Sequence, residues 1–140
     1  MSDGFVDTGA WLALIMPDDM HHQEATVFFR TLARGVHLVT SNYVLSETYT
    51  WLRYRDSHAT AVRFHQRIVD AERTGLLSVV WVTPGIAEHA WGIFARYGDQ
   101  EFSFTDCTSF VISRVRPVDF VFGFDSDFRT MGFDLRPGAR

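Results

Sequence analysis

The chain has 140 residues, of which 46% are hydrophobic, and it carries 17 acidic and 13 basic residues for a formal net charge of −4. This size and apolar content predict a single domain over residues 1–140 with one buried core. All the basic residues are arginines, which excludes a P-loop because that motif needs a lysine. The acidic balance also disfavours a protein that holds nucleic acid by its overall charge.

Cysteine use and the N-terminal sequence bear on the compartment. Cys107 is the one cysteine in the sequence, so no intramolecular disulfide can form and nothing favours an oxidising environment. The first apolar run, residues 11–16, is too short for a signal-peptide core or a membrane span. We therefore expect a cytoplasmic protein that does not associate with a membrane.

In chain order, the residue pattern predicts strands that alternate with helices. We expect a strand at residues 5–6, a helix at 9–16 stopped by Pro17, and a helix at 21–34 that ends before Gly35. A strand at 36–39 leads to a helix up to about residue 55, and a helix at 59–73 precedes a strand at 77–82. The remaining elements are helices at 84–97 and 105–115, a strand at 118–124, a short helix near Phe128 and a strand at 133–135.

The apolar residues of these helices recur at helical spacing and predict which faces turn inward. The four tryptophans are expected mostly in the core, and the expected inward positions are Val27, Phe28, Leu32, Val44, Leu45, Thr48, Trp51, Leu52, Val62, Ile68 and Val69. The clearest strands are apolar on both faces, which is typical of a parallel sheet covered by helices on both sides. The predicted fold is a three-layer α/β/α sandwich with a central, mainly parallel sheet.

Four acidic residues from separate segments converge in this fold. Asp7 and Asp125 directly follow predicted strands, so both lie at the carboxyl edge of the sheet, where open α/β sheets bind ligands. Glu47 lies in the helix that leaves the strand at 36–39, roughly 7–9 Å from that helix's start. Asp106 lies in the first turn of a helix whose amino end points back to the same edge. Clustered carboxylates repel one another unless a cation is bound, and Mg²⁺ or Mn²⁺ prefers such oxygen ligands, so we predict a metal-dependent hydrolase.

Each acid also has a purely structural interpretation. Asp7 and Asp106 are placed to cap helices or to complement helix dipoles, and aspartates are common in turns such as the one that holds Asp125 and Asp127. Glu47 is harder to explain in this way, because it lies on the inward side of its helix, where an unpaired carboxylate is costly. Spacing alone does not separate Asp125 from Asp127. The histidines match no zinc-binding spacing and are expected at exposed positions.

At these positions the sequence resembles the PIN-domain family, and most closely its VapC-type toxins from toxin–antitoxin pairs. Residues 5–8, Phe-Val-Asp-Thr, resemble the family's opening strand and first acid, and Ser46-Glu47 resembles its internal glutamate. Residues 104–106, Phe-Thr-Asp, resemble the third acid with its preceding hydroxyl, and residues 122–128 are similar to the closing strand and its acid. The resemblance covers nearly the whole chain, although Gly9 stands where the family more often has Ser or Asn.

The resemblance implies a PIN-like fold and a Mg²⁺- or Mn²⁺-dependent endoribonuclease that hydrolyses RNA. The implied catalytic and metal-binding residues are Asp7 and Asp106 for the principal ion, with Glu47 and Asp125 completing its shell or holding a second ion, and Asp127 as the alternative to Asp125. It also implies a small antitoxin protein as partner and a homodimer. Two alternatives stay open: a housekeeping RNA-processing nuclease with the same site, and a PIN-like interaction module whose acids no longer bind metal.

Overall fold

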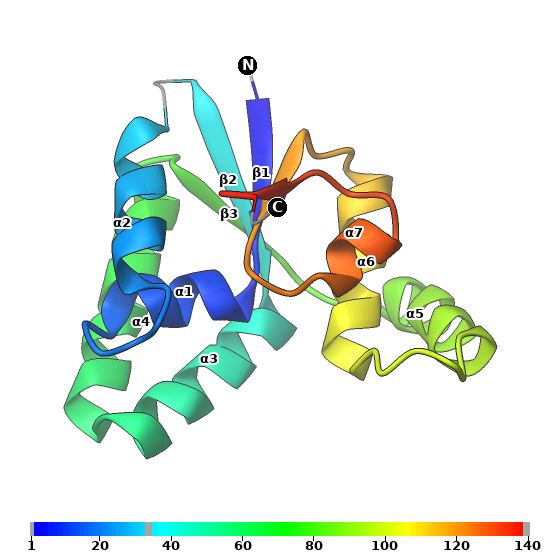
Figure 1. The fold of residues 1–140 in the computed structure, drawn as a ribbon, viewed down its shortest axis with the longest axis horizontal. Helices are drawn as coiled ribbons and strands as arrows, with labels where there is room; N and C mark the ends of the chain where they lie inside the picture. Colours follow the sequence, from blue (N-terminus) through cyan, green and yellow to red (C-terminus); the bar gives the residue numbers. More distant parts are fainter. Residues whose placement is uncertain (1, 33–34, 139–140) are drawn as a thin grey trace.

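The computed structural model describes residues 2–32 and 35–138 (Figure 1). Its strands are β1 (Ser2–Val6), β2 (Val36–Ser41), β3 (Leu77–Val80), β4 (Phe120–Phe122) and β5 (Leu135–Arg136). Its helices are α1 (Thr8–Ile15), α2 (His22–Thr31), α3 (Asn42–Arg55), α4 (His58–Arg73), α5 (Pro84–Arg96), α6 (Phe104–Val115) and α7 (Asp127–Thr130). The elements follow one another in the predicted order.

The strands form one sheet of five in the order β3-β2-β1-β4-β5, and every pairing is parallel. β1 is the central strand, and its Gly4 lies opposite Leu38 of β2 on one side and Phe120 of β4 on the other. In Figure 1, α1, α2 and α4 lie on one side of the sheet and α6 and α7 on the other, with α5 outside α6. The predicted three-layer α/β/α sandwich is therefore confirmed, and its carboxyl strand ends face α3.

The core explains why the central strands are apolar on both faces. Phe5 and Val6 of β1 and Val121 and Phe122 of β4 are completely buried, as expected for parallel strands covered by helices on both sides. On one side Trp11 of α1 packs edge-on against Phe64 of α4, and Phe28 of α2 packs against Phe122. On the other side Phe110 of α6 packs edge-on against Phe128 of α7. Aromatic contacts thus join α2 to the sheet and join the helices within each layer.

Several inward positions predicted from helical spacing are confirmed. Val44, Leu45, Thr48, Leu52 and Ile68 are buried, and Phe28 and Leu32 pack against the core while partly exposed. The prediction is wrong for four other positions, which are exposed: Val27 (53%), Val62 (43%), Val69 (36%) and Trp51 (47%). Trp81 and Trp91 are also exposed, which leaves Trp11 as the buried tryptophan of the described residues. For the helical positions, the reason is that neighbouring elements cover a narrower face of each helix than the spacing of its apolar residues suggests.

Several element boundaries differ from the prediction by a few residues, and three of them bear on the sheet and its cover. The helix predicted at 21–34 ends at Thr31, and the last predicted residues, 33–34, lie outside the described residues. β1 begins at Ser2 rather than Phe5, because its amino end pairs with β2. β4 is shorter than predicted, because the Val118 N–H donates to Ser113 O at the end of α6 and does not join the sheet. Among the described residues, no helix is long and apolar enough to cross a membrane.

Candidate metal centre

Asp7 lies at the point where the central strand ends. It is 6% exposed and occupies the N-cap of α1, yet its side chain makes no capping hydrogen bond. Its backbone N–H donates to Phe122 O at 3.0 Å, which ties it to the end of β4. Gly123 leaves room for this approach, because a Cβ there would lie 3.2 Å from the Asp7 Cβ. Helix capping therefore does not account for the Asp7 carboxylate.

The electrostatic setting of Asp7 is unfavourable for a negative charge. Burial raises the pKa of Asp7 well above its ordinary value of 3.8, and the neighbouring charge of Asp106 raises it further. The backbone hydrogen bond from Thr8 opposes this rise, while Asp125 and Glu47 add smaller contributions of the same sign. All four predicted site residues are thus close enough to influence the titration of one carboxyl group.

Asp106 lies in the first turn of α6, and the start of that helix differs from the prediction. The helix begins at Phe104 rather than Thr105, and its N-cap is Ser103. The Ser103 hydroxyl accepts a hydrogen bond from the Asp106 N–H at 3.0 Å, and Asp106 Oδ2 accepts one from the Ser103 N–H at 3.0 Å. This capping box holds the carboxyl group at the helix terminus. The capping box engages one carboxylate oxygen of Asp106, and the other oxygen takes no part in the capping box.

The pKa of Asp106 is raised to about 6. Burial is the largest cause, the hydrogen bonds from Ser103 lower the pKa, and the charges of Asp125 and Glu47 raise it. A residue that served only as a helix cap would gain from its hydrogen bonds and from the helix dipole, and its pKa would fall. The upward shift therefore reflects burial first and the acidic neighbours second, and both outweigh the capping hydrogen bonds.

Glu47 approaches the same place from α3. The Ser41 hydroxyl caps this helix by accepting the Val44 N–H at 3.0 Å, which fixes the first turn of α3 directly after β2. Glu47 is partly buried, and its neighbour Thr48 is completely buried. Its charge contributes to the raised pKa of both Asp7 and Asp106. The sequence prediction that Glu47 faces inward near the sheet edge agrees with this position.

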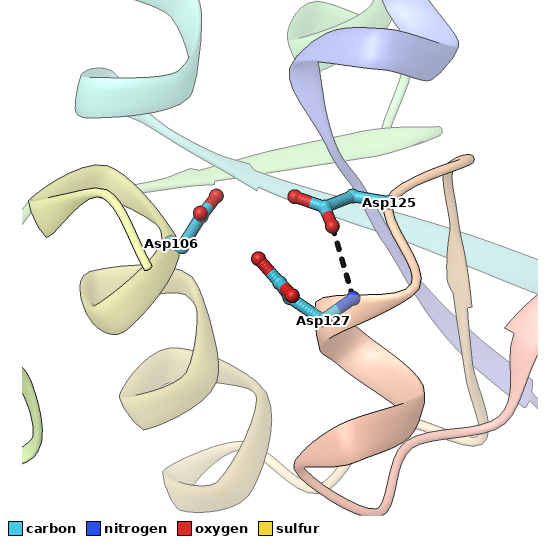
Figure 2. A group of neighbouring side chains, drawn as sticks. All are labelled: Asp106, Asp125 and Asp127. Carbon is cyan, nitrogen blue, oxygen red and sulfur yellow. Dashed lines mark hydrogen bonds between the residues drawn. The ribbon is translucent and has the colours of Figure 1, made fainter. Parts of the chain in front are cut away.

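Asp125 and Asp127 lie between the end of β4 and the first turn of α7. Asp125 Oδ1 accepts a hydrogen bond from the Asp127 N–H at 2.9 Å, so the Asp125 carboxylate is held against the start of α7. Figure 2 shows both carboxylates beside Asp106, and one oxygen from each of the three residues lies within 4.8 Å of the others. The structure therefore brings both candidates for the fourth position to Asp106.

Asp127 shares the perturbed titration of the cluster. Burial raises its pKa, and Asp125 raises it further by its charge and by its hydrogen bond. The charge of Glu101, which lies just before α6, adds to this rise. Sequence reasoning missed Glu101, because it stands in a loop where no periodicity or strand end indicates its position.

Within the described residues, no salt bridge neutralises the acids of this cluster. The ion pairs of residues 2–32 and 35–138 involve Asp3, Asp19, Glu24, Asp70 and Asp134 instead. Carboxylates that face one another without a cation raise one another's pKa, which is the pattern seen here.

A divalent cation would relieve this repulsion. The donor set consists of carboxylate oxygens, the ligands that hard cations prefer, and it contains neither histidine nor cysteine. The residues present therefore fit an oxygen-ligated divalent metal and do not fit a zinc site of the Cys/His type.

Comparison with known proteins agrees with the fold. A family model described as the PIN domain matches residues 4–134. The chain is 35% identical over 134 residues to the 23S rRNA-specific endonuclease VapC20 of Mycobacterium tuberculosis, covering 95% of this chain and 98% of that protein. It is 27% identical to a VapC ribonuclease of Archaeoglobus fulgidus, covering 92% of this chain and 82% of that protein.

Solved structures of VapC-type proteins also match this chain. The crystal structure of M. tuberculosis VapC20, described as a sarcin-ricin loop cleaving toxin, matches with a TM-score of 0.82 and 34% identity over 93% of this chain and 95% of that one. VapBC2 from Rickettsia felis, bound to a DNA fragment from its promoter, matches with a TM-score of 0.70 at 9% identity, over 96% of this chain and 97% of that one, and so supports the fold alone. The chain belongs to the PIN-domain family.

Proposed function

We propose that this protein is a divalent-metal-dependent endoribonuclease that acts as the toxin of a toxin–antitoxin pair. The observation that carries the proposal is the cluster of acids at the carboxyl edge of the sheet. In addition to burial, the charges of Glu47 and Asp125 raise the pKa of Asp7 and of Asp106, and no ion pair of the described residues involves any of these four acids. The 35% identity to an rRNA-specific endonuclease over nearly the whole chain supports the same activity.

The metal in this proposal is Mg²⁺ or Mn²⁺. Asp7 and Asp106 hold the principal ion, and Glu47 and Asp125 complete its shell or help to hold a second ion. Asp127 is the alternative to Asp125, because both of their carboxylates lie beside Asp106. A bound divalent cation lowers the pKa of a coordinated water and stabilises charge on the attacking and leaving oxygens of a phosphodiester.

The protein's own residues supply the geometry for this chemistry. The capping box with Ser103 fixes one oxygen of Asp106 and leaves the other for a ligand. The buried position of Asp7 and the hydrogen bond that Asp125 accepts from the Asp127 N–H hold these two carboxylates before any ligand arrives. Preorganisation of this kind lowers the cost of binding metal and substrate together. No nucleophilic side chain is needed, because the attacking group is water.

The substrate and the partner that we propose for this chain are taken from its relatives. We propose ribosomal RNA as the first substrate to test, since VapC20 is named for cleavage of 23S rRNA. A toxin of this kind would act in the cytoplasm, as a homodimer, and would be held inactive by a small antitoxin protein. The match to a VapBC complex at 9% identity supports the fold that such complexes use.

The decisive experiment uses the purified chain, free of any co-purified partner, with ribosomes or total RNA and Mg²⁺ or Mn²⁺. Cleavage should depend on the metal and should be lost with EDTA and in Asp106→Asn. Mn²⁺ binding without cleavage would indicate a substrate missing from the mixture. If calorimetry detects no Mn²⁺ binding, the chain is a metal-free interaction module.

The toxin assignment needs a separate test, because a housekeeping nuclease would share the site. Induced expression of the chain should arrest growth, and a small reading frame directly upstream should relieve the arrest when it is co-expressed. Absence of such a neighbour, together with cleavage of a precursor RNA, would favour RNA processing instead.

A further inference from the structure

The loop between α1 and α2 contacts the segment that carries Asp125. The imidazole of His21 stacks on the ring of Phe124, with centroids 4.1 Å apart and planes inclined by 3°. This is the closest and most nearly parallel ring pair among the described residues. The sequence predicted an exposed histidine here, whereas His21 is partly buried.

His21 is fixed from its own side of the stack. Its backbone N–H donates to Asp19 Oδ1 at 2.9 Å, and its carbonyl oxygen accepts from the Ala25 N–H at 2.9 Å, within the first turn of α2. Its ring Nδ1 lies 3.3 Å from Glu24 Oε1. Because Ala25 is completely buried, the imidazole is attached to a part of α2 that the core holds firmly.

The other side of the stack has fewer restraints. Pairing of β4 with its neighbours ends at Gly123, whose N–H donates to Arg136 O at 3.0 Å. Neither the Phe124 nor the Asp125 backbone bonds to another segment of residues 2–32 and 35–138, apart from local bonds to the first turn of α7. Phe124 packs partly against the core, and with no backbone hydrogen bond to another segment its stack on His21 is a main restraint on this segment.

The stack also continues an existing interface. Phe28 of α2 packs on Phe122 and Phe120 of β4, with centroids 4.9 and 5.9 Å apart. Side chains alternate along a strand, so Phe120 and Phe122 share one face of β4. The chain bends at residues 123–124 after β4 ends, and the Phe124 ring contacts α2's amino end through His21. His21, at the amino end of α2, contacts Phe124, just as Phe28, further along α2, contacts Phe120 and Phe122. α2 thus aligns β4 and the residue that precedes Asp125 as one row of aromatic contacts.

We propose that His21 is a positioning residue for the metal centre: by stacking on Phe124, it fixes the backbone from which Asp125 reaches toward Asp106. This inference rests on the proposed function, because Asp125 affects metal binding only if the cluster holds a metal. A flat ring is what the contact requires. Phenylalanine or tyrosine at position 21 should therefore replace histidine, and a side chain without a ring should not.

The first test measures Mn²⁺ binding by calorimetry together with metal-dependent RNA cleavage. His21→Ala and His21→Leu should bind Mn²⁺ about three- to tenfold more weakly, the range expected for loss of one aromatic pair. His21→Phe should bind it as the wild type does. His58→Ala, which changes an exposed histidine at the start of α4, is the matched control. Unchanged affinity in His21→Leu, or equal losses in His21→Phe and His21→Leu, would overturn the proposal.

The second test uses metal-free protein, so its result does not depend on the proposed function. Hydrogen exchange at the amides of residues 124–127 should be faster in His21→Leu than in the wild type and should return to the wild-type rate in His21→Phe. If the wild type bound no Mn²⁺ but showed this pattern, the nuclease proposal and the metal-positioning role would fail, and only the fixing of residues 124–127 by His21 would stand. Unchanged exchange in His21→Leu would refute that role.

Discussion

The two ends of the central strand place aspartates in opposite settings. At the amino end of β1, Asp3 Oδ2 lies 3.6 Å from Arg116 Nε, and the Asp3 N–H donates to Asp119 Oδ2 at 2.9 Å. At the carboxyl end, Asp7 is nearly buried and its neighbours Asp106, Asp125 and Glu47 carry the same charge. The fold therefore pairs the acid near the amino end of β1 with an arginine, and it gives no basic partner, among the described residues, to the acid that directly follows β1.

This difference separates structural acids from candidates for a functional role. Asp3 shows that the fold can supply an arginine to a carboxylate at a sheet edge. At the opposite edge, burial and like charges raise the pKa of Asp7 and Asp106, which costs stability while no ligand is bound. Groups kept in such a state are candidates for a functional site. Substitutions at the two edges should accordingly have opposite consequences for activity and stability.

The largest effect is expected from Asp7→Asn and Asp106→Asn. Each removes a proposed metal ligand and should lower RNA cleavage by more than about 100-fold, beyond the usual loss from outer-shell changes. Each also removes repulsion, so the free energy of unfolding of the metal-free protein at pH 7 should hold steady or rise by up to about 2 kcal/mol. Thermal denaturation in EDTA measures this. A marked fall in stability would identify these acids as structural and remove them from the site.

The next effect concerns the fourth ligand. Asp125→Asn and Asp127→Asn should differ, because Asp125 Oδ1 already accepts the Asp127 N–H while both residues reach Asp106. We expect Asp125→Asn to weaken Mn²⁺ binding about tenfold or more, in line with loss of a ligand or its support, and Asp127→Asn to weaken it less. Calorimetric titration of the two variants decides the order. The reverse order would assign the position to Asp127.

Most of the fold follows from the sequence, because the relevant signals are local. Strands that are apolar on both faces and helices that begin or end at identifiable residues predict a covered parallel sheet, and the element order is confirmed. The misplaced inward positions, such as Val27 and Trp51, have another cause. Periodicity shows which residues share a helix face, but it does not show how far the neighbouring element covers that face.

The site follows from the sequence to the extent that topology determines it. Strand ends and helix starts bring Asp7, Glu47 and Asp106 to one edge, whereas their role as metal ligands stays a prediction. The choice between Asp125 and Asp127 depends on the geometry of one turn, which spacing does not specify. The contact of His21 with Phe124 depends on how α2 lies on β4, and no local pattern encodes that distance.

A pH titration should sharpen the comparison between the two edges. The folded-state pKa of Asp106 is about 6, above its ordinary value of 3.8, so the folded protein binds the proton more tightly than the unfolded chain does. The free energy of unfolding of the metal-free protein should therefore lose a contribution as pH rises from about 4 to about 6, and Asp7 should extend this loss to higher pH. Denaturant unfolding in EDTA across this pH range is the measurement. The free energy of unfolding should depend less steeply on pH in Asp106→Asn than in the wild type.

Protons and metal compete for the same oxygens, so Mn²⁺ should reverse this dependence. The affinity of the protein for Mn²⁺ should fall by up to about tenfold for each pH unit below 6, if Asp106 releases one proton when the ion binds. Calorimetry at several pH values provides the measurement. An affinity that does not change between pH 5 and 7 would mean that Asp106 is not a ligand.

The smallest effect should come from the paired acid at the amino edge. Asp3→Asn removes a contact with Arg116, whose side chain is 41% exposed, so solvent screens much of the interaction. The free energy of unfolding should fall by no more than about 0.5–1 kcal/mol, while metal-dependent cleavage and Mn²⁺ affinity stay at wild-type values. Denaturant unfolding and the cleavage assay, run beside Asp7→Asn, compare two aspartates of one strand under the same substitution. If Asp3→Asn impaired cleavage as strongly as Asp7→Asn, loss of charge anywhere on β1 would explain both results, and the carboxyl edge would lose its special status.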